Sequence, residues 1–325
     1  MSGIQVLALS DGLKFGARVR GVTHATLANA SVRDELVALF ERCGLIVFEG
    51  VVPSGAMQVA ISTVFGPLKD HPTKTTVRAD EDIGEGVIDM HYKPVAGDVS
   101  SGEALIEIGG QLLARFSPWH FDHCYNDELN RAGVLRAPIN APIGGRTGFM
   151  DGIELYRRLS PALREAIEGR NVIYTLDTRL SKMKYGVNFR SMTEHLSTPQ
   201  LLLEAARFPR AMHPAVWTRK SGEKVMHFGP WMAVGIEHDE SAEGDALLDA
   251  IGHEMNALAG SACAYWHNWK STDMVIWDNW RMLHAVEGCD AQYERRTLRT
   301  TIKGDYGLGY FEDGKKVGEV LREIA

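Results

Sequence analysis

The sequence contains little cysteine and no long apolar run. Its four cysteines, Cys43, Cys124, Cys263 and Cys289, are widely separated and form no CxxC pair. This spacing indicates reduced, mostly buried thiols rather than a disulfide framework. The N-terminal segment lacks the charged region and apolar stretch of a signal peptide, and nowhere do 18 apolar residues run together. We therefore expect a cytoplasmic protein without a membrane-spanning helix.

Basic residues are too few and too dispersed for a surface that binds polyanions. The chain has 35 Lys and Arg against 42 Asp and Glu, which gives a formal net charge of -7 at pH 7. This balance argues against nucleic acid, which favours a basic face. No basic run or Lys- and Arg-rich amphipathic stretch indicates a membrane surface either. Homo-oligomerisation is left open by these features.

The 325 residues also lack an internal repeat, a low-complexity linker, regular βαβ alternation and a Gly-rich dinucleotide fingerprint. Strand-like runs dominate the second half, for example MVIWDN (274–279) and RTLRTTIKG (296–304). We predict one domain over residues 1–325, mainly β with flanking helices. Its core is expected to be a double sheet of the jelly-roll type.

Two helices and a long irregular segment are expected in the first third of the chain. The pattern SVRDELVALFERCG predicts a helix capped by Ser31 and ended by Gly44, and Ser54 is expected to cap a second helix that ends near Gly66. Residues 70–115 contain HPTKTT, EDIGEG and KPVAGDVSSGE, which are typical of loops. Because long loops in compact domains often cover a site, we predict an active-site lid within this segment.

The stretch SPWHFDHCYND (117–127) gathers several side chains that can bind a metal ion. In a strand, His120 and Asp122 would share one face with Cα atoms about 7 Å apart. Two ligands do not make a site, and an isolated HxD is more often an ordinary polar strand. His284, which follows MVIWDN, can supply a third ligand from a distant part of the chain. Two histidines and one carboxylate on one face suit non-haem Fe(II).

The segment YERRTLRTTIKGD (293–305) places Arg295, Thr297 and Arg299 on one strand face. A solvated edge strand would explain this pattern without any ligand. If the face points inward, however, two arginines require anions, and arginine suits bidentate capture of a carboxylate.

Taken in order, WHxD, GGxT, WDNxxxxH and RxxxR before TIxGD resemble the taurine / 2,4-dichlorophenoxyacetate dioxygenase family (TauD/TfdA type). The resemblance covers nearly the whole chain, from FGARVRGVTHATL to TTIKGD. It implies an Fe(II)- and 2-oxoglutarate-dependent dioxygenase with a double-stranded β-helix, cupin-like core. Such an enzyme hydroxylates a C–H bond of a small molecule with O2 and releases succinate and CO2.

The resemblance also implies roles for particular residues. His120, Asp122 and His284 match the catalytic metal ligands. Thr147 and Arg295 match residues that hold 2-oxoglutarate. Arg299, four residues further along the same strand face, matches an Arg that faces the acidic group of the substrate. Spacing alone does not separate its role from that of Arg295.

On the substrate side, His71 matches a substrate-contacting His. Phe116, Tyr125, Trp231 and Met232 fall in segments that border the family's pocket, although each alone is typical of a core. Together they indicate a substrate larger and more apolar than taurine, with an aromatic group as one option and an acidic group for Arg299.

The remaining residues of the opening stretch, His123, Cys124 and Asp127, are interpreted as bystanders. Two other functions stay open at this point. One is a zinc-dependent hydrolase on the same three ligands, which leaves RxxxR unexplained. The other is a non-catalytic jelly-roll binding protein.

Overall fold

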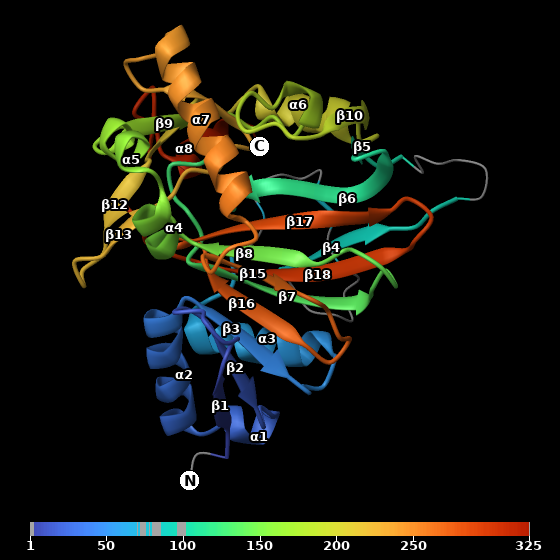
Figure 1. Cartoon of the computed structure of the whole chain (residues 1–325). Helices are drawn as coiled ribbons and strands as arrows, with labels where there is room; N and C mark the ends of the chain where they lie inside the picture. The colour runs from blue at the N-terminus through green and yellow to red at the C-terminus, as the bar shows by residue number, and fades with distance from the viewer. Residues whose placement is uncertain are drawn as a thin grey trace.

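The computed structural model describes residues 3–69, 71, 76–77, 79, 86–95 and 102–324, and this part of the chain is mainly β with helices outside the sheets (Figure 1). Two large sheets dominate it. The chain crosses from one to the other and back through three consecutive strands: β16 (Met274–Asp278), β17 (Met282–Asp290) and β18 (Arg295–Ile302). Residues close in sequence therefore face each other from different sheets.

The first large sheet has seven strands in the order β1-β2-β3-β16-β7-β18-β4. Its remaining strands are β1 (Gln5–Ala8), β2 (Ala17–Arg20), β3 (Leu45–Glu49), β4 (Val87–Tyr92) and β7 (Ala132–Ile139). Only β2 and β3 pair in parallel. The other neighbours in this sheet pair antiparallel.

The second large sheet has six strands in the order β10-β5-β6-β17-β8-β15, all antiparallel. Besides β17 it contains β5 (Leu105–Ile108), β6 (Gln111–His120), β8 (Thr147–Asp151), β10 (Arg190–Thr193) and β15 (Ala264–His267). Two small sheets lie beside it. They contain β9 (Asn171–Tyr174), β11 (Ala211–Pro214), β12 (Val216–Thr218), β13 (Lys224–Met226), β14 (Ala233–Ile236) and β19 (Tyr310–Phe311).

Helices cover the outer faces of both large sheets (Figure 1). On the seven-stranded sheet these are α1 (His24–Leu27), α2 (Ala30–Cys43) and α3 (Gly55–Phe65). Beyond the six-stranded sheet lie α4 (Gly152–Arg158), α5 (Pro161–Ile167), η2 (Leu180–Lys182), α6 (Thr198–Ala205), α7 (Ala242–Leu258) and α8 (Val317–Ile324). Leu248, Ile251 and Met255 of α7 share a core with Phe121, Met150 and Leu283.

Strand alternation in the seven-stranded sheet explains how both of its faces are buried. Ile46 and Ile276 belong to the core under the helices, whereas Val47, Val275 and their neighbours belong to a second core that includes Phe149 of the other sheet. Because successive side chains point to opposite faces, a run such as LIVFE serves two cores at once. This accounts for the continuous apolar runs in the sequence.

Two local expectations need correction. The helix predicted from Ser31 begins at Ala30 as α2, and its N-cap is Asn29, whose side chain accepts from the Ser31 N–H at 2.9 Å. Gly44 ends it in the left-handed region at φ 72°, and the second helix has the expected Ser54 cap. The description of 70–115 as irregular is wrong for the part that the structure describes, because 87–92, 105–108 and 111–115 belong to strands.

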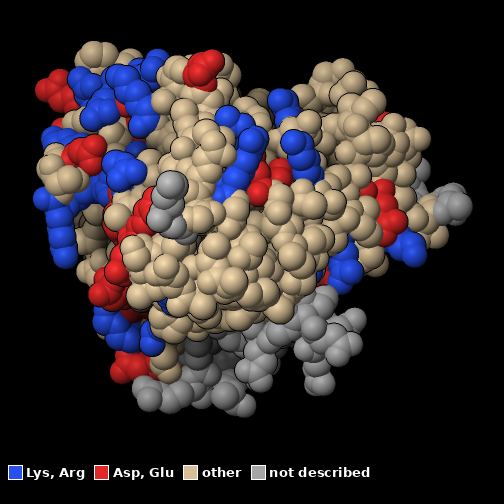
Figure 2. All heavy atoms as spheres, turned by 90° about the horizontal axis from the view of Figure 1, so that it is seen from below, with Lys and Arg blue, Asp and Glu red and all other residues tan. Residues whose placement is uncertain are grey.

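The described parts of 70–115 pair with distant strands, β4 with β18 and β5 with both β6 and β10. The predicted lid otherwise lies largely outside the described residues. Over the described ranges, no helix is both long and apolar enough to cross a membrane. On the face seen from below, acidic and basic side chains are interspersed and neither forms a continuous patch (Figure 2).

Candidate active site

A cavity of about 330 Å³ opens beside β6, β17 and β18, and every site residue predicted from the sequence lines it. These residues are His71, Phe116, His120, Asp122, Tyr125, Thr147, Trp231, Met232, His284, Arg295 and Arg299. They come from both large sheets and from connections far apart in the chain.

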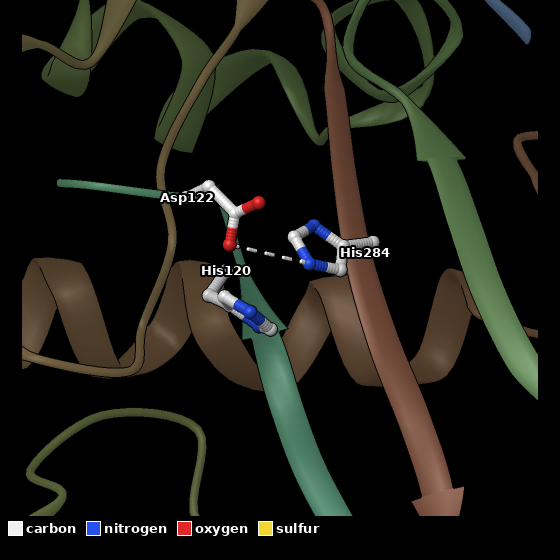
Figure 3. A group of neighbouring side chains, drawn as sticks. All are labelled: His120, Asp122 and His284. Atoms are coloured by element: carbon white, nitrogen blue, oxygen red, sulfur yellow. Dashed lines mark ion pairs between the residues drawn. The ribbon is translucent and has the colours of Figure 1, made fainter. Parts of the chain in front are cut away.

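The three candidate metal ligands converge at this cavity (Figure 3). His120 is the last residue of β6, Asp122 follows it, and His284 on β17 is the direct cross-strand partner of His120. One ligand atom from each lies within 4.8 Å of the others. Among the described residues, no other group of three or more His, Cys, Asp or Glu side chains has its ligand atoms this close together.

A hydrogen bond orients His120, and burial keeps both imidazoles neutral, as metal ligands must be. The Nδ1 of His120 lies 2.7 Å from the Pro118 carbonyl oxygen. Since a carbonyl only accepts, Nδ1 carries the proton and Nε2 is left with a free lone pair. Burial lowers the pKa of His120 and His284 below the ordinary value, so both rings are neutral at pH 7.

Asp122 is charged despite its burial. Burial alone would raise the pKa of this carboxyl, but the Arg299 guanidinium, which donates to Oδ1 at 2.6 Å, holds it below its usual range. The other oxygen, Oδ2, is buried without a hydrogen-bond partner among the described residues. A buried anionic oxygen left unpaired is costly. A divalent cation bound by two imidazoles and this carboxylate would satisfy it.

Asn279 fixes the backbone of Asp122. Its Oδ1 accepts from the Asp122 N–H at 2.8 Å, and its Nδ2 donates to the Asp122 carbonyl oxygen at 3.0 Å. The carbonyl of Asn279 is in turn bonded to Nε2 of His227 at 2.9 Å. Asn279 therefore joins the turn before His284 to the segment that carries Asp122.

The arginine strand has the expected alternation. Arg295, Thr297 and Arg299 line the cavity. The opposite face meets α3, where Thr300 Oγ1 lies 2.7 Å from Ser62 Oγ and the Leu298 carbonyl accepts from Gln58. The solvated-edge alternative is therefore wrong, because β18 lies between β7 and β4 in the sheet.

Arg295 is a buried cation without a carboxylate partner among the described residues. Its side chain is 2% exposed, and its hydrogen bond is from Nε to the Gly145 carbonyl oxygen at 3.2 Å. Burial and the neighbouring Arg115 guanidinium lower its pKa to about 10, so it remains charged at pH 7. An uncompensated buried charge is expensive unless a ligand supplies the opposite one.

The other end of the cavity is mixed aromatic and polar. The Trp231 ring stands edge-on to His120 with centroids 4.9 Å apart, and Phe116 packs against Phe189 at 5.0 Å. Tyr125 and Met232 are buried and also belong to the core beyond the cavity. The His71 Nδ1 lies 2.9 Å from the Thr76 hydroxyl.

His123 differs from its interpretation as a bystander. It lines the cavity, is 3% exposed, stands edge-on to His71 at 5.2 Å, and neither of its ring nitrogens has a hydrogen-bond partner. Continued strand alternation would place His123 on the face opposite His120 and Asp122. The strand ends at His120, and His123 has a left-handed backbone with φ 62°. Cys124 and Asp127, by contrast, do not line the cavity.

Sequence reasoning also missed a buried ion pair in the cavity wall. Arg115 Nη1 and Glu103 Oε2 lie 3.0 Å apart, and both residues line the cavity. Both fall in the segment that was expected to be irregular. The signal that could have found them is Gly109-Gly110 between LIEI and QLLARF, because a Gly-Gly pair between two strand-like runs is typical of a two-residue hairpin turn.

Comparison with known proteins agrees with this geometry. The family model described as "Taurine catabolism dioxygenase TauD, TfdA family" matches residues 6–301. The alpha-ketoglutarate-dependent 2,4-dichlorophenoxyacetate dioxygenase of Cupriavidus pinatubonensis is 27% identical over 282 residues, covering 86% of this chain and 91% of that protein. The (S)-phenoxypropionate/alpha-ketoglutarate-dioxygenase of Sphingobium herbicidovorans is 27% identical over 294 residues, covering 90% and 92%.

Solved structures share the fold. A taurine dioxygenase from Burkholderia xenovorans superimposes with a TM-score of 0.65 at 20% identity, over 96% of this chain and 94% of that one. AAD-2 in complex with Mn(II) and N-oxalylglycine gives 0.66 at 21% identity, over 93% and 98%. The family match spans every candidate site residue, and the chain belongs to the TauD, TfdA dioxygenase family.

Proposed function

We propose that this protein is an Fe(II)- and 2-oxoglutarate-dependent dioxygenase that hydroxylates a C–H bond of a small acidic, partly apolar molecule and releases succinate and CO2. The observation that carries the proposal is the pairing of two features in one cavity. Two histidines and a carboxylate converge there, and a buried Arg295 without a counter-ion lies in the same wall.

The metal would be held by His120, Asp122 and His284. Two neutral imidazoles and one carboxylate are the donor set of non-haem Fe(II) sites that keep positions open for other ligands. With O2 and 2-oxoglutarate bound, this centre supplies the oxidising chemistry that inserts hydroxyl into a C–H bond. The residues of the chain orient the ligands and exclude water.

The co-substrate would be anchored by Arg295 and Thr147. A guanidinium at 2% exposure in a cavity attracts a carboxylate strongly, because little water competes. The distal carboxylate of 2-oxoglutarate supplies that charge, and the Thr147 hydroxyl adds a hydrogen bond. Binding would thus compensate the unpaired charge of Arg295.

The prime substrate would meet Arg299, His71 and His123 at its acidic group and apolar side chains elsewhere. The apolar contacts proposed are Phe116, Tyr125, Trp231 and Met232. His123 adds a donor and an acceptor that are unused within the described structure. A carboxylate attached to an aromatic or other apolar body fits this division, as in the acids named for the two relatives above.

A zinc hydrolase on the same ligands explains less of the site. It needs a carboxylate base beside the metal. Of the described acidic residues that line the cavity, the one other than Asp122 is Glu103, which is paired with Arg115. The zinc alternative gives Arg295 no role, and a non-catalytic binding protein would not need the complete ligand set of His120, Asp122 and His284.

We propose the finer architectural predictions as well. The crossings β16–β17–β18 and the antiparallel pairing of both large sheets support a double-stranded β-helix as the core of one domain over 1–325. A cover over the cavity is proposed within 70–115, supported by the described His71, Thr76, Met90, Glu103 and Ala104 in the cavity wall. A cytoplasmic location stays a prediction from the sequence.

The decisive experiment is oxygen consumption and succinate release by the purified protein with Fe(II) and 2-oxoglutarate, first alone and then with a panel of aryloxyacetates, other aromatic acids and alkyl sulfonates. We expect slow uncoupled turnover alone and stimulation by an aromatic acid. Stimulation by a neutral ester but not its acid would contradict the proposed substrate class. Activity with Zn(II) in place of Fe(II) and without 2-oxoglutarate would contradict the reaction itself.

A further inference from the structure

Trp269 lies just beyond β15 and reaches back to the candidate co-substrate residue Thr147. Its indole Nε1 donates to Thr147 Oγ1 at 2.9 Å, with Trp269 8% and Thr147 1% exposed. Thr147 is the first residue of β8 and pairs in register with His267, the last residue of β15. The two-residue step from His267 to Trp269 brings the indole onto the same hydroxyl.

The chemistry of the two groups fixes the direction of this bond. An indole N–H only donates, whereas a hydroxyl has one proton and two lone pairs. Trp269 therefore occupies a lone pair of Thr147 and cannot accept its proton. No other hydrogen bond to the Thr147 side chain is present among the described residues, so its proton is available to an acceptor in the cavity that Thr147 lines.

A second donor, the Arg295 guanidinium, lies in the cavity wall near Thr147. Two residues earlier, the Gly145 carbonyl holds Nε of Arg295 and leaves the rest of that guanidinium to the cavity. The Thr147 hydroxyl and the Arg295 guanidinium then both donate toward one end of the cavity. Such a pair of donors recognises an anion and does not serve an uncharged group.

Trp269 itself is held in place. Its ring stands edge-on to His267, with centroids 4.5 Å apart and planes at 88°. The buried His267 is held by Tyr265, whose hydroxyl lies 3.1 Å from Nδ1. The indole therefore has little freedom to leave the hydroxyl.

We propose that Trp269 is a positioning residue that commits the Thr147 hydroxyl to donate to the distal carboxylate of the co-substrate, and so contributes to selecting a dianionic 2-oxo acid over a monoanionic one. This inference rests on the function proposed above. It assigns a role to a residue outside the metal site and outside the cavity lining.

The test compares two 2-oxo acids of equal carbon number, 2-oxoglutarate and 2-oxopentanoate, the second with a methyl in place of the distal carboxylate. Their dissociation constants are measured by calorimetry on Mn(II)-loaded protein, so that binding is read without turnover. Trp269→Phe removes the N–H and keeps most of the ring. We expect about five- to tenfold weaker binding of 2-oxoglutarate, as for one lost hydrogen bond to a charged network, and unchanged binding of 2-oxopentanoate.

A double-mutant cycle tests whether Trp269 acts through Thr147. In a Thr147→Val background, Trp269→Phe should have no further effect on 2-oxoglutarate. Trp217→Phe is the matched control, since it removes an indole N–H bond of equal length, 2.9 Å, to the Trp280 carbonyl away from the cavity. Should Trp269→Phe not fold, Trp269→Leu, which also lacks the N–H, replaces it in the same cycle with Thr147→Val.

The outcomes separate the two proposals. Equal loss for both 2-oxo acids, or additive effects of Trp269→Phe and Thr147→Val, would overturn the role of Trp269. If the wild type binds 2-oxoglutarate no better than 2-oxopentanoate and Arg295→Ala changes neither, the proposed function fails and this inference fails with it.

Discussion

The metal end and the anion end of the cavity are built differently. At the metal end, Asp122 is tied to Asn279 by two bonds of 2.8 and 3.0 Å, and His120 is fixed by a carbonyl at 2.7 Å. At the anion end, Arg295 has one bond to a carbonyl at 3.2 Å and no carboxylate partner among the described residues. At the metal end the ligand residues are already oriented before a metal binds. At the anion end the positive charge is already present before an anion binds.

This difference teaches where each ligand's binding energy arises. A metal site depends on ligand atoms that are already oriented, and loosening the supporting residues weakens it indirectly. An anion site depends on a charge that water cannot reach, and removing that charge acts directly. Substitutions at the metal end should therefore change metal affinity, whereas substitutions at the anion end should change 2-oxoglutarate affinity.

The largest effect is expected from removing a ligand at the metal end. Asp122→Ala should abolish succinate production, because it removes the one carboxylate of the ligand set and leaves Arg299 unpaired. The measurement is succinate release with Fe(II) and 2-oxoglutarate. Asp127→Ala is the control: this buried carboxylate belongs to the same stretch but accepts from the Val317 N–H and lies outside the cavity. Turnover by Asp122→Ala equal to that of the control would place the metal elsewhere.

Removing the charge at the anion end should have the next largest effect. Truncating one partner of a buried charge pair typically costs about 2–5 kcal/mol, or roughly thirty-fold to several-thousand-fold in affinity. Arg295→Ala should raise the apparent KM for 2-oxoglutarate by that order while metal affinity stays constant. The control is Arg296→Ala, because Arg296 lies on the opposite strand face and is bonded to Asp89 at 3.0 Å. This variant should leave the KM for 2-oxoglutarate and the metal affinity unchanged. A loss of metal affinity in Arg295→Ala would remove the distinction between the two ends.

Removing a residue that supports a metal ligand is expected to have a smaller effect than removing the ligand itself. Asn279→Ala removes both bonds to the Asp122 backbone without touching a ligand atom. Loss of such supporting contacts typically lowers metal affinity by 10–100-fold. The check is a calorimetric titration with Mn(II), together with the KM for 2-oxoglutarate at saturating metal. A changed KM with unchanged metal affinity would contradict the supporting role of Asn279.

Arg299 lies between the two ends, and its substitution should sharpen the comparison. It donates to Asp122 at 2.6 Å, and its Nε has no partner among the described residues. Arg299→Ala should weaken the prime substrate about tenfold or more, as for a hydrogen bond to a charged group, and should uncouple 2-oxoglutarate consumption from hydroxylation. The ratio of succinate to hydroxylated product measures this. If the variant instead loses 2-oxoglutarate affinity alone, the substrate need not be an anion.

The smallest effect is a pH dependence confined to the anion end. Burial and Arg115 lower the pKa of Arg295 to about 10, from an ordinary value of 12.5. The guanidinium is charged below that pH and loses its proton above it, so 2-oxoglutarate affinity should be constant between pH 7 and 9 and fall as pH rises past about 10. Calorimetric titrations across this range would show it, with 2-oxopentanoate as the control that does not change.

The sequence predicted the residues of the metal and anion sites better than the residues that lie next to them. Strand period and motif order were enough to place Arg295 and Arg299 on one face and to bring His284 to His120. His123 was misread because the period applies only while the strand lasts, and β6 ends at His120. Trp269 was missed because its bond to Thr147 spans 122 residues, and no local pattern encodes such a contact.

Strand β4 was missed for a related reason. VIDMHY alternates poorly between apolar and polar residues, and its stability as β4 comes from pairing with Arg295 to Thr300 of β18. Here a partner strand more than 200 residues away in sequence, rather than local propensity, determines the structure. Strands β5 and β6, by contrast, form a local hairpin around Gly109-Gly110. The cap is Asn29 rather than Ser31. Asn and Ser are equally preferred at the N-cap, so residue preference alone does not decide between two positions that are two residues apart.

The division of the cavity wall between strands and connections has a consequence for how this protein can diverge. His284, Thr147 and Arg295 are on strands of the two large sheets, whereas Leu176, Trp231 and Met232 lie in connections between elements. Connections tolerate replacement far better than paired strands. Descendants of such a chain can acquire new substrates by exchanging loops while inheriting the oxidising centre intact, and a laboratory that wishes to retarget the enzyme should randomise those loops and leave the sheets alone.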